Sequence, residues 1–101
     1  MLNLQAVTHE DFEPRLHERF TLETPTAASV ELELVSVETR GRFDPARDKR
    51  QVFSIVFRGA SDSNLPQSIY RLTNETLGVM ELFLVPLGPD ETGTLYEAVF
   101  T

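Results

Sequence analysis

Residues 29–38 read SVELELVSVE, and their pattern points to a β-sheet fold. Up to Leu34 the stretch alternates strictly between apolar and acidic or small polar side chains. This period of two is typical of a β-strand that places one face in a core. After Leu34 the apolar phase moves by one residue, to Val35 and Val37. Such a shift turns all later side chains to the other face, so we predict a β-bulge or bend near Leu34 and Val35.

Five further segments have the composition of strands. Residues 51–58, QVFSIVFR, are rich in β-branched and aromatic side chains, with Phe53, Ile55 and Phe57 on one face. The other four segments span residues 19–24, 68–73, 79–86 and 94–100. Residues 82–85 are apolar on both faces, which favours a central strand. The composition of residues 25–28, 74–78 and 87–93 predicts turns.

A short helix is predicted near residues 9–16. Thr8 suits the N-cap position, and Asp11 lies where a capping box has its acid. Val7 and Phe12 have the spacing of a hydrophobic staple around that cap. Pro14 lacks the N–H that a longer helix would need, so the helix should be short.

Short connections between successive strands favour antiparallel pairing, because parallel crossovers need a dozen or more residues. We therefore expect a mainly β fold, either a compact six-stranded antiparallel barrel or a two-sheet roll. The short N-terminal helix should plug one end. At 101 residues the chain has the length of one domain, so residues 1–101 are taken as a single β-barrel-like domain.

Composition excludes several classes of function. The chain has no cysteine, which removes disulfides, thiolate metal sites and cysteine nucleophiles. Its longest apolar run, residues 82–87, is far below the about 20 residues of a membrane span. The first residues lack the pattern of a signal peptide, so the cytoplasm is the expected location. A net charge of −7 argues against nucleic-acid binding, which needs basic phosphate contacts.

Both histidines lie in THEDFEPRLH, residues 8–17. His9 and His17 are eight residues apart, whereas a zinc-binding helix needs a spacing of four. We interpret them as solvated residues at the helix ends rather than as metal ligands. No nucleophile elbow and no glycine-rich phosphate loop is present. The sequence thus predicts no enzyme activity, no metal and no cofactor.

Residues 40–50, RGRFDPARDKR, are the one segment with a distinctive charge. They hold five of the nine basic residues and carry +3, while the rest of the chain carries −10. This length is typical of loops that are functional or mobile. We predict a partner-docking loop made by Arg40, Arg42, Phe43, Arg47, Lys49 and Arg50. The alternative is a solvated hairpin loop whose arginines balance the acidic body.

Seven segments together carry a family resemblance: THEDFEPRL, FTLETP, VELELVSVE, FSIVFRG, LPQSIYRL, LGVMELFLVPLGPD and YEAVF. They resemble a family of short bacterial domains of unknown function, similar in length to this chain. The genes of that family often lie near those of phage-tail-collar-like proteins. The resemblance implies an accessory or assembly role, and it implies no catalytic residues.

Two main hypotheses for function follow. The first is a non-enzymatic interaction module with a protein partner, linked to a phage-tail-like assembly. The second is a small-ligand-binding β-barrel, suggested by Tyr70, Arg71 and Tyr96 near strand ends. An uncharacterised hydrolase is the weakest alternative. A filled barrel interior would favour the first hypothesis, and a roomy interior would favour the second.

Overall fold

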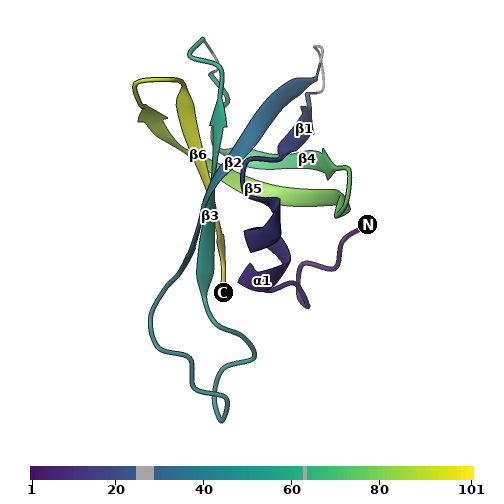
Figure 1. Ribbon diagram of the computed structural model, residues 1–101, viewed down its shortest axis with the longest axis vertical. Coiled ribbons are helices and arrows are strands. Elements are labelled where there is room, and N and C mark those ends of the chain that lie inside the picture. The colour runs from purple at the N-terminus through teal and green to yellow at the C-terminus, as the bar shows by residue number, and fades with distance from the viewer. Residues whose placement is uncertain (25–28, 63) are drawn as a thin grey trace.

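The computed structural model describes residues 1–24, 29–62 and 64–101. In this part of the chain six antiparallel strands close into a barrel in the order β1-β2-β3-β6-β5-β4 (Figure 1). This confirms the predicted mainly β fold and selects the barrel over the two-sheet roll. The strands are β1 (Arg19–Glu23), β2 (Val30–Thr39), β3 (Phe53–Gly59), β4 (Ser68–Asn74), β5 (Gly78–Pro89) and β6 (Thr94–Phe100). A short helix, α1 (His9–Phe12), and a 3-10 turn, η1 (Glu13–Arg15), precede β1.

β2 contains the bulge that the sequence predicts. Leu34 and Val37 lie three residues apart, yet both are opposite inward-facing residues of β3, Phe57 and Ile55. The register shifts directly after Leu34, which leaves Val35 as the extra residue. The bulge therefore lets both halves of β2 direct apolar side chains inward and bends the strand around the barrel.

The inner faces of all six strands supply the core. Phe53, Ile55 and Phe57 of β3 are fully buried, as predicted. β6 adds Tyr96 and Phe100, which are also buried. The remaining buried apolar side chains of the strands are Phe20, Leu22, Leu32, Leu34, Leu72, Met80, Leu82, Leu84 and Ala98. Side chains thus fill the barrel interior, as is usual for a small barrel.

The helix closes one end of the barrel, as predicted. The Thr8 N–H donates a hydrogen bond to the Asp11 carboxylate at 2.8 Å, which is one half of a capping box. Val7 and Phe12 on either side of the cap are both buried. The Phe12 ring lies 6.0 Å from the Phe53 ring and 5.5 Å from the Phe100 ring, measured between centroids. The helix therefore continues the aromatic core rather than lying on the surface.

The predicted end of β5 was wrong. The strand does not end at Pro86 but continues to Pro89, so the connection to β6 is shorter than expected. A bulge between Pro86 and Gly88 makes this possible, because a bulge tolerates proline and Gly88 adopts a φ of 103°. β5 does lie between two other strands, β4 and β6, as expected of a central strand, but its outward residue Phe83 is 49% exposed. The turn predicted at residues 25–28 lies outside the described residues.

The molecule measures 44 × 29 × 23 Å along its principal axes. Figure 1 shows that the connection between β2 and β3 extends beyond the helix end of the barrel and forms part of the long axis. None of the helices in residues 1–24, 29–62 and 64–101 has both the length and the apolar character that a membrane span requires.

Candidate functional site

The predicted docking loop is the connection between β2 and β3, and its base is tied to the barrel. The Arg40 N–H donates to the Val52 main-chain oxygen at 2.7 Å, which extends the β2–β3 hairpin. The Gln51 side chain donates a second bond across the base, to the Arg40 oxygen at 2.5 Å. The Arg40 guanidinium turns back to the barrel wall, where it meets Glu97 at 2.7 Å and Ser54 at 3.0 Å. Arg40 therefore positions the loop instead of extending from it.

Arg50, at the other side of the loop, is held still more firmly. Its guanidinium donates hydrogen bonds to three main-chain oxygens, those of Leu4, Val7 and Thr101. It also lies 5.8 Å from the Phe53 ring centroid and 5.5 Å from the Phe100 ring centroid, within cation–π range. Arg50 thus joins the N-terminal segment, β6 and the aromatic core at the helix end of the barrel. We therefore leave it out of the candidate docking residues.

The remaining four predicted residues form the outer part of the loop: Arg42, Phe43, Arg47 and Lys49. All four are exposed, and we call them the basic tip. Phe43 is 41% exposed, so its ring is available for contact. Arg47 contacts a carboxylate of its own loop, that of Asp48, at 3.4 Å.

Two aspartates order the loop below the basic tip. The Asp48 carboxylate accepts a hydrogen bond from the Asp44 N–H at 3.0 Å. The Asp44 main-chain oxygen in turn accepts the N–H groups of Arg47 and Asp48, at 3.0 and 2.7 Å. The loop's carboxylates are thus engaged within the loop, and its exposed charge is basic.

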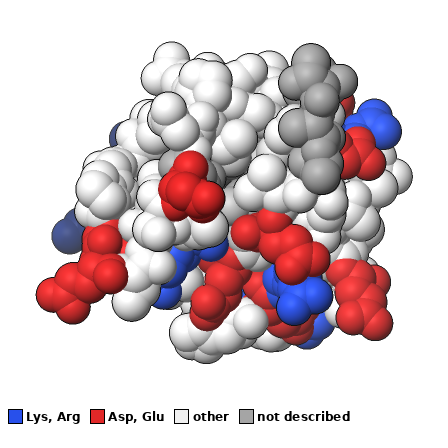
Figure 2. Space-filling model, turned by 90° about the horizontal axis from the view of Figure 1, so that it is seen from above, with Lys and Arg blue, Asp and Glu red and all other residues white. Residues whose placement is uncertain are grey.

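The opposite end of the barrel has a different charge. Figure 2 shows that end, where acidic side chains gather on one side and outnumber the basic ones. The basic tip therefore lies at the end of the molecule away from this acidic surface.

The histidines have separate environments. His9 is not the solvated residue that we expected, because its ring packs edge-on against Phe53 with centroids 6.1 Å apart. Its Nδ1 lies 3.2 Å from a Glu13 carboxylate oxygen. His17 is exposed, adopts a φ of 71°, and contacts Glu33 at 2.9 Å. The described residues contain no group of three or more potential metal ligands.

A half-exposed ion pair holds the turn between β5 and β6. Arg58 donates to the Asp90 carboxylate through two nitrogens, at 3.0 and 2.7 Å. The same carboxylate accepts the N–H groups of Thr92 and Gly93, at 2.9 and 2.8 Å. The hydrogen bond from Arg58, followed by that from Thr92, lowers the pKa of Asp90 from 3.8 to about 2. A Cβ on Gly93 would collide with the Gly59 oxygen, so β3 and the turn meet closely here.

Asp90→Asn is expected to lower the melting temperature at neutral pH and to make the acid limb of the stability curve shallower. The folded-state pKa of Asp90 is depressed, so its stabilising contribution is present above 3.8 and is lost as the pH falls toward about 2. The difference in melting temperature between wild type and Asp90→Asn should therefore shrink across that pH window. A difference that stayed constant from pH 5 to pH 2 would contradict the assignment; thermal melts followed by circular dichroism measure it.

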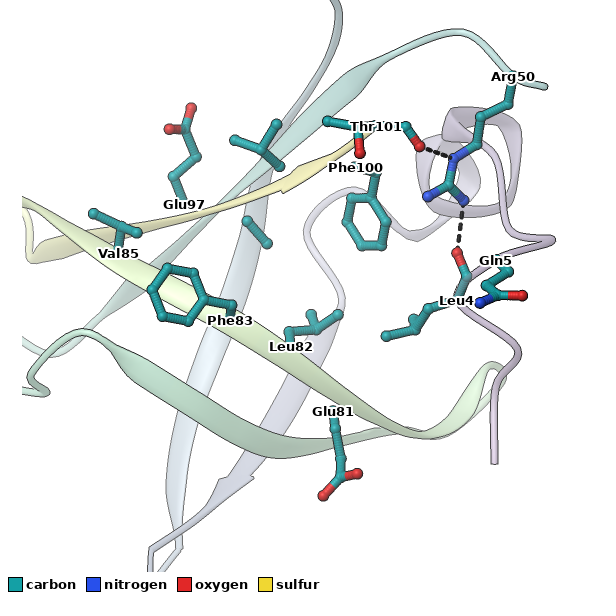
Figure 3. A pocket seen from close by; sticks show the side chains of 12 residues that line it. Leu4, Gln5, Arg50, Glu81, Leu82, Phe83, Val85, Glu97, Phe100 and Thr101 are labelled. Carbon is teal, nitrogen blue, oxygen red and sulfur yellow. Dashed lines mark hydrogen bonds between the residues drawn. The ribbon is translucent and has the colours of Figure 1, made fainter. Parts of the chain in front are cut away.

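A second candidate site lies between β5 and β6, which pair over only part of their length. Their ladder runs from Pro89 opposite Thr94 to Val85 opposite Glu97. Beyond that pair the strands diverge and leave a groove of about 460 Å³, lined in part by Phe83 (Figure 3). We call this groove the β5–β6 seam.

The N-terminal segment closes the wide end of the seam. The Leu2 N–H donates to the Val79 main-chain oxygen of β5 at 2.7 Å. Leu4 packs against the core, and its oxygen receives the 2.6 Å hydrogen bond from Arg50. Figure 3 shows Arg50 bridging Leu4 and Thr101 across this end. The inner part of the seam is therefore filled, and its outer face is open.

The seam was not predicted from the sequence, because the apolar pattern of a strand shows which of its faces is buried but not which strand lies beside it. Two features did point to it: Phe83 and Val99 are apolar at outward positions of β5 and β6. The apolar second face of residues 82–85 was interpreted as the sign of a central strand, whereas Phe83 and Val99 are 49% and 52% exposed. Of the residues proposed for ligand binding, Tyr96 is buried, Tyr70 is half-buried and donates to the Pro66 oxygen, and Arg71 is exposed.

Comparison with known proteins places the chain in one family. No curated protein and no solved structure matches it. A protein-family model matches residues 7–100, from the helix staple to the end of β6, and thus all six strands of the barrel. The chain therefore belongs to the family described as Domain of unknown function (DUF6916).

Proposed function

We propose that the protein is a non-enzymatic interaction module that docks a protein partner through the basic tip. The observation that carries the proposal is the division of charge within the loop. Its two aspartates are used in hydrogen bonds that shape the loop, while Arg42, Phe43 and Lys49 remain exposed. An arginine and an aromatic residue side by side are the residue types most enriched at protein interfaces.

The partner surface that fits the basic tip is acidic with an apolar depression. Exposed basic groups attract such a surface at a distance and speed association, more than they add to final affinity. Phe43 would supply the apolar anchor at the centre of the contact. Nucleic acid is a poor fit, because the remainder of the chain carries −10 and would repel phosphates.

The cellular setting is also part of the proposal. A cytoplasmic bacterial protein that accompanies a phage-tail-like assembly would need a docking surface rather than an active site. The setting rests on the family resemblance described above, and the charge of the basic tip is compatible with it.

The alternative of a small-ligand-binding barrel has less support. Phe20, Phe57 and Tyr96 lie fully buried in the interior, and the rings of Phe20 and Phe57 are in contact at 5.0 Å between centroids. A ligand inside the barrel would have to displace these side chains. A small ligand would therefore need the β5–β6 seam.

Replacing Arg42, Phe43 and Lys49 by serine is expected to weaken partner capture at least tenfold, the effect of losing an interface anchor worth about 1.4 kcal/mol or more. Immobilised full-length chain would be exposed to lysate of the native bacterium, and retained proteins quantified by mass spectrometry. Capture by the wild type should fall as salt rises from about 50 to about 300 mM, since exposed charges are screened within about 10 Å.

The matched control removes two charges and one apolar side chain elsewhere: Arg19→Ser, Arg71→Ser and Leu87→Ser. All three residues are exposed on the barrel. The control should retain the same proteins as the wild type, and both triple variants should melt close to it. If the wild type and the tip variant captured the same amount of partner, or if both triple variants lost capture equally, the basic tip would not be the docking surface.

A further inference from the structure

The backbone of the seam is prepared for a further strand. The Val79 oxygen points away from β4, since it accepts the Leu2 N–H. Alternate residues of a strand direct their N–H and C=O groups to the same side, so those of Glu81 and Phe83 also face the seam. Val85, next in this series, meets Glu97 of β6. The ladder ends there, and in the described chain no strand pairs with the seam side of Glu81 and Phe83.

The facing edge of β6 has the same property. Glu97 pairs with Val85, so the N–H and C=O groups of Val99, two residues later, also point toward the seam. On its other side β6 is fully paired with β3, from Thr94 to Phe100. Two strand edges with unpaired backbone groups therefore face each other across the groove. Natural proteins usually protect such edges, because they are templates for pairing with another chain.

The outer rim of the seam is apolar. Phe83 and Val99 are 49% and 52% exposed, and Val85 lies beside them on the rim. Ile69 of β4 lies directly opposite Phe83 and is 65% exposed, so the apolar surface continues onto the next strand. Scattered exposed apolar residues are ordinary, but a contiguous patch marks an interaction site.

One charged side chain at the rim, that of Glu81, indicates which charge a bound segment should carry. Glu81 is exposed on β5, two residues from Phe83 and on the same outward face. It makes no ion pair or hydrogen bond within the described residues, although Arg71 lies opposite it in the β4–β5 register. Figure 3 shows its side chain leaving β5 on the side away from Phe100 and Leu4. Opposite charges on neighbouring strands are stabilising, so a strand added here gains from a basic residue beside Glu81.

We propose that the β5–β6 seam binds an extended segment of a protein partner by β-strand addition. The segment pairs with the open edge of β5 at Glu81 and Phe83. It carries an apolar outward side chain beside Phe83 and Val99 and, two residues away, a lysine or arginine beside Glu81. Main-chain hydrogen bonds supply affinity in this mode of recognition, and the alternate side chains supply specificity.

This site is independent of the basic tip. The two surfaces differ in charge preference, since the tip fits an acidic partner and the seam fits a basic segment. They also differ in mode, because the seam uses backbone pairing. Changes in the tip should therefore leave seam binding intact, and failure of one proposal does not decide the other.

The test begins with a library of linear peptides displayed on phage, about eight residues long, which exceeds the usual strand length. Selection against the full chain should enrich sequences with an apolar and a basic residue two positions apart, and without proline between them. A synthetic enriched peptide is then measured by fluorescence polarisation. Amide hydrogen exchange should show new protection at Glu81, Phe83 and Val99 when this peptide is bound.

Matched variants identify the surface. Phe83→Thr should weaken the peptide at least tenfold, while Phe43→Thr, the same change in the basic tip, should leave its affinity unchanged. Glu81→Lys should weaken the enriched peptide and should favour a version in which its basic residue is replaced by glutamate. That reversal depends on the charge pair, and a general loss of folding would not produce it.

The proposal would be overturned if selection enriched no sequence, or if hydrogen exchange showed no new protection at the seam. It would also be overturned if the peptide bound the wild type and Phe83→Thr equally, or if it bound equally well after proline replaced the peptide residue opposite Phe83. A dimer in sedimentation that Phe83→Thr dissociates would instead assign the seam to a second copy of the chain. If a small apolar dye bound the seam and no peptide displaced the dye, the seam would be assigned to a small ligand.

Discussion

A chain that lacks residues 95–101 is expected to lose cooperative unfolding and to accumulate as unfolded or insoluble protein. β6 lies between β3 and β5, so its loss removes both ladders that close the barrel. The deletion also takes Tyr96 and Phe100 out of the core. Each large apolar side chain contributes about 1.5–3 kcal/mol when buried, and a domain has only about 5–15 kcal/mol in total. The measurement is a thermal melt followed by circular dichroism, together with the soluble yield.

A deletion of equal length in the loop is the control. Removing residues 42–48 takes out seven residues, but none of them belongs to the buried core. The hydrogen bond from Arg40 to Val52 below the deletion can still close the β2–β3 hairpin. This chain should stay soluble and melt cooperatively. A truncated chain without β6 that melted near the full-length temperature would show that the barrel closes without this strand.

Strand faces were predictable because they follow from local spacing. The odd interval between Leu34 and Val37 indicated a bulge, and β2 has its extra residue at Val35. Phe53, Ile55 and Phe57 were assigned to one face, and all three are buried. The helix cap was predictable for the same reason, since its contacts span only a few residues.

Neighbours across the barrel were not predictable in the same way. Nothing local to residues 79–86 shows that β6 leaves β5 beyond Val85, where the N-terminal segment and Arg50 lie at the wide end of the seam. The apolar second face of residues 82–85 was therefore interpreted only as the sign of a central strand, although Phe83 borders an open edge. The sequence shows that Phe83 is apolar, but it does not show that no strand of the described chain pairs with the seam side of β5 at this position.

The candidate site shows the same limit for charge. The sequence does not distinguish Arg40, Arg42 and Arg50 from one another, and all three were assigned to one docking loop. In the structure Arg40 and Arg50 form long-range contacts with β6 and the N-terminal segment, while Arg42 makes no hydrogen bond or ion pair with the residues that the structure describes. Only the fold separates arginines that anchor the loop from those that are available to a partner.

The largest effect expected from a single substitution is at the helix end of the barrel, where Phe53 is the central side chain. It is fully buried. The Phe100 ring stacks on it at 4.6 Å between centroids, and the Phe12 ring lies 6.0 Å away. His9 packs on its edge, and the Arg50 guanidinium lies 5.8 Å from its centroid. Truncation of Phe53 would therefore remove the common contact of β3, β6, α1 and the loop anchor.

Phe53→Ala is expected to lower the free energy of unfolding by about 3–5 kcal/mol, the range for a buried phenylalanine whose cavity cannot collapse. Aromatic neighbours on several sides are held by different elements, so they cannot all move into the space. Urea denaturation followed by circular dichroism measures the loss. Phe83→Ala is the control, because its side chain is 49% exposed and its removal should cost about 1 kcal/mol or less. If the two substitutions had similar small effects, the aromatic cluster would not be what holds the helix, β3 and β6 together.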